Sequence, residues 1–112
     1  MSNEMLDWQG VLAAGTLQRS EYAAKIRDFI ANERDTASLV SAALMQGDAE
    51  KARQLVHENR MRANELGAKK LASVAMSLEM AIRAGADNTV SLKQFESVAM
   101  DTLLAMSGFL TL

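Results

Sequence analysis

The fold of this chain follows from residues 47–68, which read GDAEKARQLVHENRMRANELGA. Gly47 suits the left-handed residue just after a helix end, and Asp48 then suits the N-cap of a new helix. Beyond Asp48, inward-facing positions recur at steps of three and four, as on one face of an α-helix. We therefore expect a helix from about Ala49 to Glu65, ended by Gly67, with one face formed by Ala52, Leu55, Val56, Asn59, Ala63 and Leu66.

The segments on either side show the same helical spacing and are also separated by glycines. Before the central helix we expect a short helix over residues 7–14, capped by Asp7, and a long helix over residues 20–45. After it we expect a helix over residues 68–84 and a last helix that begins with a capping box of Ser91 and Gln94. The apolar stripe of the long helix comprises Tyr22, Ile26, Phe29, Ile30, Ala37, Val40 and Leu44.

Because the connections are short, neighbouring helices should pack antiparallel. We expect an all-α fold, an antiparallel four-helix bundle with an additional short N-terminal helix. Residues 1–112 fit a single domain, in which we expect residues 1–6 to be frayed or partly foreign to the natural chain.

The composition excludes several classes of protein. The chain has no cysteine, so it can form neither a disulfide framework nor a thiolate metal site. Its formal charge of −2 and its 4% aromatic residues argue against nucleic-acid binding. No stretch approaches the length of a membrane span, and the N-terminus lacks the pattern of a signal peptide. We therefore expect no membrane insertion and a cytoplasmic location.

His57 is the only histidine and the main candidate functional residue. On a helical wheel with about 100° per residue, it falls about 140° from Ala52, on the solvent side. The side chains expected around it on that side are Arg53, Gln54, Arg60, Met61 and Asn64.

This arrangement suits phosphoryl chemistry. A neutral imidazole is a competent nucleophile toward an acyl phosphate, and nearby guanidinium groups can stabilise charge on phosphoryl oxygens. Arg60, one turn from His57, is better placed for that role than Arg53. A single exposed histidine is nevertheless more often an ordinary surface residue, and the two arginines can equally pair with Glu50 or Asn64. A metal site is disfavoured, because no carboxylate lies three or four residues from His57.

The stretch from His57 to Ala68 resembles the signature of bacterial histidine phosphotransfer (HPt) domains, roughly H-x-L-K-G-x-A-x-x-L-G-A with a leucine three residues later. Arg60 replaces the usual lysine and keeps its charge. The resemblance extends over nearly the whole chain, through residues 6–9, 47–50 and 78–79 and Gly85. The residues that match the signature are His57, Ala63, Leu66, Gly67, Ala68 and Leu71.

The resemblance implies an intermediate of a two-component phosphorelay. Such a domain accepts a phosphoryl group from a receiver-domain aspartate, here onto His57, and passes it to another receiver aspartate. Arg60 would support the phosphoryl group. The domain is a carrier without kinase activity and needs no cofactor of its own, since magnesium is expected on the partner receiver domain. The implied partners are response-regulator receiver domains and a hybrid sensor kinase, and we expect a monomer.

Two residues depart from the family pattern. Met61 stands where glycine is usual; it either crowds the approach of a receiver or supplies an apolar contact. Asn59 lies in the core-facing stripe where leucine is usual, and a buried amide without a hydrogen bond costs about 1–3 kcal/mol. We expect Asn59 to bond to a polar group on a neighbouring helix or to reach water.

We expect the docking surface for a receiver to contain Arg53, Gln54, Met61 and Asn64 beside His57, together with residues of the long preceding helix. Met61 also motivates an alternative, a degenerate HPt-like bundle that binds partner proteins without phosphotransfer. A third possibility is a plain helical bundle, such as a dimerisation module, whose likeness to the family is accidental.

Overall fold

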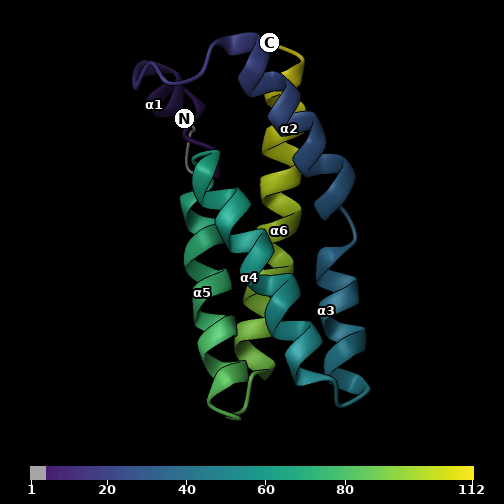
Figure 1. Ribbon diagram of the computed structural model, residues 1–112. Helices are drawn as coiled ribbons and strands as arrows, with labels where there is room; N and C mark the ends of the chain where they lie inside the picture. The colour runs from purple at the N-terminus through teal and green to yellow at the C-terminus, as the bar shows by residue number, and fades with distance from the viewer. Residues whose placement is uncertain (1–4) are drawn as a thin grey trace.

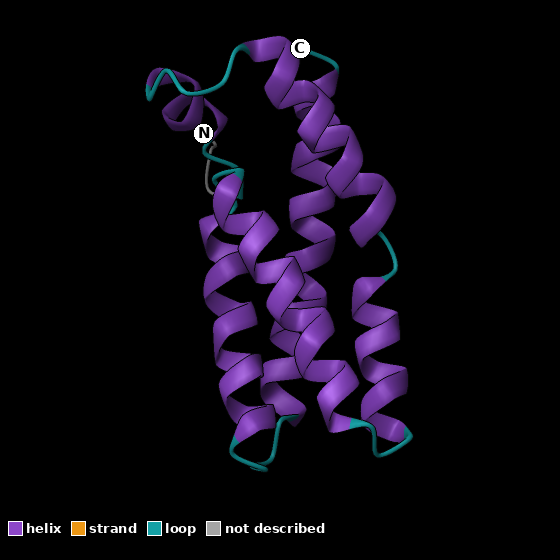
Figure 2. Cartoon of the chain, in the orientation of Figure 1, coloured by secondary structure: helices purple, strands orange, loops and turns teal. Residues whose placement is uncertain are grey.

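The computed structural model describes residues 5–112 and is all-helical, with no strand in that range (Figure 2). The described helices are α1 (Trp8–Ala13), α2 (Arg19–Glu33), α3 (Thr36–Met45), α4 (Ala49–Glu65), α5 (Lys69–Arg83) and α6 (Thr89–Leu110). None of these helices is long and apolar enough to cross a membrane.

The structure is elongated, with principal-axis extents of 41 × 22 × 21 Å. α2 and α3 follow one another along one column, and α4, α5 and α6 then run back and forth beside it (Figure 1). α4 packs against α3 on one side and α5 on the other, and α5 packs against α6. The largest fully buried side chains include Tyr22, Phe95, Ile26, Leu71, Leu78 and Met106.

The central helix has the predicted bounds, Ala49–Glu65. Gly47 has a φ of 78°, and the Asp48 side chain accepts a hydrogen bond from the Lys51 backbone N–H at 3.1 Å. Its buried face contains Ala52, Val56, Asn59 and Ala63, as the periodicity predicts. The cap therefore determines where α4 begins, and the periodicity determines which face it turns inward.

The prediction of one long helix over residues 20–45 is wrong, because the chain breaks after Glu33 and restarts at Thr36 as α3. The predicted stripe has no apolar residue between Ile30 and Ala37. At that level the inward side chains are polar: Glu33 is buried and accepts a hydrogen bond from the Thr36 hydroxyl at 2.7 Å. This local pairing competes with a continuous helix. The buried positions keep steps of four and three through the break, at Tyr22, Ile26, Phe29, Glu33, Thr36, Val40 and Ala43.

The predicted capping box of Ser91 and Gln94 is also wrong. α6 begins earlier, at Thr89, and Ser91 lies within its first turn. The Asp87 carboxylate accepts hydrogen bonds from the Thr89 backbone N–H at 3.0 Å and from the Thr89 hydroxyl at 2.8 Å. Aspartate commonly bonds to backbone groups two residues on, so this earlier turn starts the helix.

The segment before α1 is held against the turn between α4 and α5. The Asp7 backbone N–H donates to the Gly67 carbonyl at 3.0 Å, and the Asp7 side chain caps α1 by accepting from the Gly10 N–H at 3.0 Å. Leu6 is 2% exposed in the core, so the prediction of frayed residues 1–6 is wrong for Leu6. The first four residues of that segment lie outside the described residues.

Tyr22 ties α2 to the same turn. Its hydroxyl donates to the Leu66 carbonyl at 2.6 Å, and burial together with the nearby charge of Asp7 raises the pKa of Tyr22. The hydroxyl therefore remains a donor. α1, α2 and the turn therefore meet at this end of the molecule, and α4 and α5 pack side by side beyond the turn.

Candidate functional site

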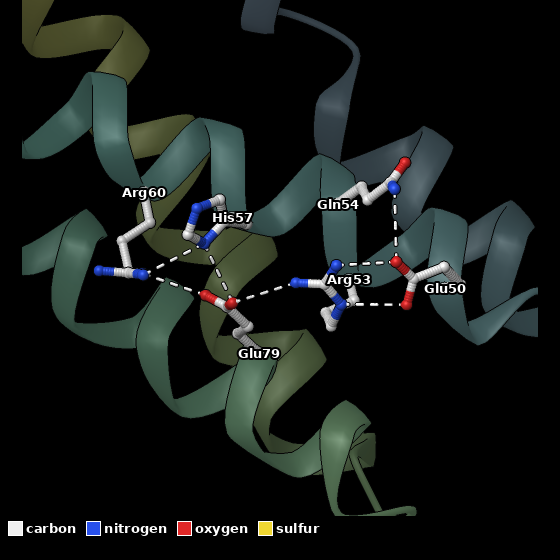
Figure 3. Close-up of polar contacts among 6 residues, drawn as sticks. All are labelled: Glu50, Arg53, Gln54, His57, Arg60 and Glu79. Carbon is white, nitrogen blue, oxygen red and sulfur yellow. Dashed lines mark hydrogen bonds and ion pairs between the residues drawn. The ribbon is translucent and has the colours of Figure 1, made fainter.

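Glu79 of α5 is the centre of a polar cluster on the face shared by α4 and α5 (Figure 3). Its Oε2 lies 3.1 Å from His57 Nδ1, and its Oε1 accepts a hydrogen bond from Arg60 Nε at 3.1 Å. Arg53 Nη1 approaches Oε2 at 3.6 Å. The Glu79 side chain is only 5% exposed, so the arginines and His57 of α4 cover it.

Glu79 is held in its ionised form. Burial raises the pKa of Glu79, but hydrogen bonds from Arg60 and His57, with their charges, outweigh burial and leave that pKa below its ordinary value. A buried carboxylate with these partners is stable, whereas an unpaired one would carry a large desolvation cost. The cluster is thus an anionic centre with cationic partners on one side.

The proton on His57 follows from this pairing. Because ionised Glu79 can only accept hydrogen bonds, His57 Nδ1 must donate to it, since two facing lone pairs would repel. Arg60 Nη2 also lies 3.2 Å from Nδ1, but a protonated Nδ1 cannot accept, so that contact is proximity rather than a second hydrogen bond. In its neutral form the ring then carries its lone pair on Nε2, which points away from Glu79 (Figure 3). The His57 side chain is 42% exposed, which leaves Nε2 open to a partner.

Arg53 and Gln54 are turned toward Glu50 of the same helix. Arg53 donates to both carboxylate oxygens of Glu50, at 3.1 and 2.7 Å, and Gln54 Nε2 donates to Oε2 at 3.3 Å. The pairing of Arg53 with Glu50 that the sequence left open is therefore present, whereas Arg60 pairs with Glu79. Arg60 and His57 both bond to Glu79 at 3.1 Å, whereas Arg53 lies 3.6 Å from it.

Met61 and Asn64 lie on the exposed side of α4, as predicted. Met61 is 56% exposed. Asn64 lines a shallow hollow between α4 and α5 together with Arg60, Lys69, Ala72, Ser73 and Met76. The structure thus places every predicted site residue on α4. Glu79 pairs with both Arg53 and Arg60, and Glu50 pairs with Arg53 as well.

Asn59 lies on the opposite, buried side of α4 and confirms the prediction of a polar partner on a neighbouring helix. Its Nδ2 donates to Glu33 Oε1 at 2.9 Å, and Arg62 pairs with the other oxygen of Glu33. Its Oδ1 is buried without a hydrogen-bond partner. α4 is consequently held from two sides by buried carboxylates, Glu33 of α2 and Glu79 of α5.

Glu79 belongs to the cluster but was not predicted as a site residue. Its position in the sequence could have indicated burial, because Glu79 follows Ala75 by four residues and Leu78 by one and so falls on the inward face of an apolar helix. An acidic residue at such a position needs a cationic partner. The sequence alone does not show that His57, 22 residues earlier, would be among its partners.

The cluster can present an imidazole lone pair beside a guanidinium group, but it does not supply a set of metal ligands. Across residues 5–112 no three histidine, cysteine, aspartate or glutamate side chains are close enough together to hold a metal ion.

Comparisons with protein-family models, with curated proteins and with solved structures found no match for this chain.

Proposed function

We propose that this chain is a histidine phosphotransfer domain, which accepts a phosphoryl group from a receiver-domain aspartate onto His57 and passes it to another receiver aspartate. The observation that carries the proposal is the contact between His57 Nδ1 and buried Glu79, which leaves Nε2 as the exposed nucleophile. The resemblance around residues 57–68 supports the same role. We also infer that the α2–α3 column, α4, α5 and α6 form the antiparallel four-helix bundle of that family.

The proposed chemistry uses groups of this chain and of the partner. The Nε2 lone pair attacks the phosphorus of the aspartyl phosphate, a nitrogen–phosphorus bond forms, and the phosphorus–oxygen bond to the aspartate breaks, which releases a carboxylate. The ring becomes positively charged, with its proton on Nδ1, and Glu79 stabilises that charge. The reverse sequence returns the phosphoryl group to a second receiver.

Arg60 is suited to support the phosphoryl group. Its Nε bonds to Glu79, and its Nη2 lies beside the His57 ring. A guanidinium held in place by a carboxylate needs little reorganisation when negative phosphoryl oxygens arrive. Magnesium belongs to the receiver in this proposal, as do the acidic residues that bind it.

The test is transfer from a receiver domain of the same organism's hybrid kinases, charged with a small phosphodonor. The wild-type chain should gain an acid-labile phosphoryl group, detected by intact mass, and His57→Gln should gain none. Because Arg53 and Arg60 still pair with Glu79 in this variant, the substitution should leave the helical fold unchanged by circular dichroism.

Absence of transfer from every cognate receiver, with the fold intact, would overturn the proposal. Binding of receivers without transfer would then favour the interaction module that Met61 suggests. Phosphorylation of the His57→Gln variant would instead show that a residue other than His57 accepts the phosphoryl group.

A further inference from the structure

Two shallow hollows lie along the line where α4 meets α5, one on each side of the His57–Glu79 contact. One is lined by Arg60, Asn64, Lys69, Ala72, Ser73 and Met76. The other is lined by Ala49, Glu50, Arg53, Ile82 and Arg83. We name the surface formed by these two hollows the α4–α5 face.

The α4–α5 face is cationic although the chain as a whole is not. It contains four cations, Arg53, Arg60, Lys69 and Arg83, and its carboxylates are Glu50 and the buried Glu79. Lys69 and Arg83 are exposed and form no ion pair with a described residue. The formal charge of the whole chain is −2, so positive charge is concentrated here.

An exposed methionine adds apolar area to the same face. Met76 is 48% exposed and lines the first hollow. Met61, one turn from His57 on α4, is 56% exposed and lies beside the face without lining either hollow. Methionine is flexible and adapts to varied partner surfaces. The face thus combines adaptable apolar contacts with positive charge.

A hollow between α2 and the C-terminal end of α4 differs in charge. It is lined by Lys25, Asp28, Phe29, Asn32, Arg62, Glu65 and Leu66. Both cations there are already paired: Lys25 lies 3.1 Å from Glu65, and Arg62 pairs with buried Glu33. This hollow has no unpaired cation among its lining residues to attract an acidic partner.

We infer that the receiver docks over the α4–α5 face, with α5 rather than α2 supplying the second half of the contact. The inference rests on the proposed phosphotransfer. The occupant it commits to is an acidic protein surface, the magnesium-binding face of a receiver, whose carboxylates complement Lys69 and Arg83 and whose apolar residues contact Met76 and Met61.

The experiment compares matched substitutions on and off the α4–α5 face. Lys69→Glu and Lys25→Glu each reverse one lysine, on α5 and α2 respectively, and change the net charge equally. Met76→Gln and Met100→Gln each replace one exposed methionine, on the α4–α5 face and on α6. The measurements are Kd for a receiver domain that phosphorylates the wild-type chain, and the rate of transfer to His57 at a receiver concentration below Kd.

We expect Lys69→Glu to raise Kd about tenfold and Met76→Gln to raise it several-fold, with a matching loss of transfer rate. Lys25→Glu and Met100→Gln should change Kd less than about twofold. Circular dichroism verifies that all four variants keep the helical fold, so that weakened binding reflects the surface.

A larger effect of Lys25→Glu than of Lys69→Glu would overturn the docking inference while transfer to wild-type His57 still supported the proposed function. Equal, small effects of all four variants would overturn it in the same way. Failure of the wild-type chain both to bind and to accept phosphate from any cognate receiver would instead remove the proposed function, and the docking inference with it.

Discussion

Glu79 shows at the residue scale why a charged group can be retained in an apolar helix face. Burying a carboxylate costs several kcal/mol even after relaxation. Hydrogen bonds to charged groups contribute about 1.5–3 kcal/mol each, and Glu79 accepts from both His57 and Arg60. The two terms are comparable, so the cluster is stable only while its partners remain.

The sequence could predict that His57, Arg60 and Met61 lie on the solvent side of α4, because helical phase alone places them there. It could not predict which carboxylate each arginine would take. Arg53 and Arg60 are both near Glu79 in space, yet Arg53 bonds more closely to Glu50 three residues away. That choice depends on how α5 lies against α4, which periodicity does not determine.

The lowered pKa of Glu79 predicts a pH dependence of stability. The folded pKa lies below the ordinary value of 4.5, so as the pH falls the unfolded state binds a proton first. Stability from this group is therefore fully present above the ordinary value and is lost as the pH falls through the folded value. Glu79→Gln lacks this group, so its free energy of unfolding should fall less over the same window.

Urea unfolding followed by the fluorescence of Trp8, the only tryptophan, measures both proteins between about pH 7 and about pH 3. The wild-type chain should be the more stable at neutral pH, and the difference should narrow in acid. Glu50 and Asp87, whose pKa values are also lowered, are common to both proteins and cancel in the comparison. A difference that stays constant with pH would show that the cluster does not hold the Glu79 charge.

At the scale of the elements, the end of a helix can be predicted where capping residues next to it in the sequence determine it. α4 has an aspartate cap and a glycine before it, and both its bounds were predicted. The break between α2 and α3 contains neither proline nor glycine. It depends on Glu33, whose partners Asn59 and Arg62 come from α4, so only tertiary structure reveals it.

Gly67, in the turn after α4, is more tightly constrained than Gly47, in the turn before α4. Gly67 has a φ of 83°, and a Cβ there would lie 2.8 Å from Val11 Cγ2 and 2.9 Å from the Asp7 carbonyl oxygen. Gly47 has a similar φ of 78°, but a Cβ there would meet nothing within 4 Å. Gly67 is thus required both by its backbone conformation and by the close approach of the segment before α1.

Gly67→Ala should therefore destabilise the fold more than Gly47→Ala. The left-handed conformation costs a non-glycine residue about 1–2 kcal/mol, which is the expected loss at Gly47. At Gly67 the displaced Asp7 backbone also loses its hydrogen bond to the Gly67 carbonyl, so we expect a loss of about 3 kcal/mol. Urea unfolding of the two variants measures the difference, and equal losses would mean that α1 moves aside without cost.

At the scale of the whole molecule, net charge and charge placement make opposite predictions. Composition predicts a weakly acidic protein of formal charge −2. The fold brings Arg53 and Arg60 of α4 together with Lys69 and Arg83 of α5. Which face becomes cationic depends on the packing of α4 against α5, so composition and periodicity could not reveal it.

The effect of salt on association with an acidic receiver distinguishes these two views. If net charge governed the encounter, two anionic proteins would repel, and added salt would speed association by screening that repulsion. If the α4–α5 face governs it, salt screens attraction and slows association. We expect the association rate constant to fall about tenfold between about 20 mM and about 500 mM salt.

Stopped-flow mixing with a receiver domain that phosphorylates the wild-type chain measures this constant across the salt range. Lys69→Glu should flatten the salt dependence, because it removes a cation that has no ion pair with a described residue, whereas Lys25→Glu should leave the slope close to that of wild type. A rate that rises with salt would show that the overall negative charge outweighs the local face. In that case the contacts around His57 would have to form after an encounter that electrostatic attraction does not guide.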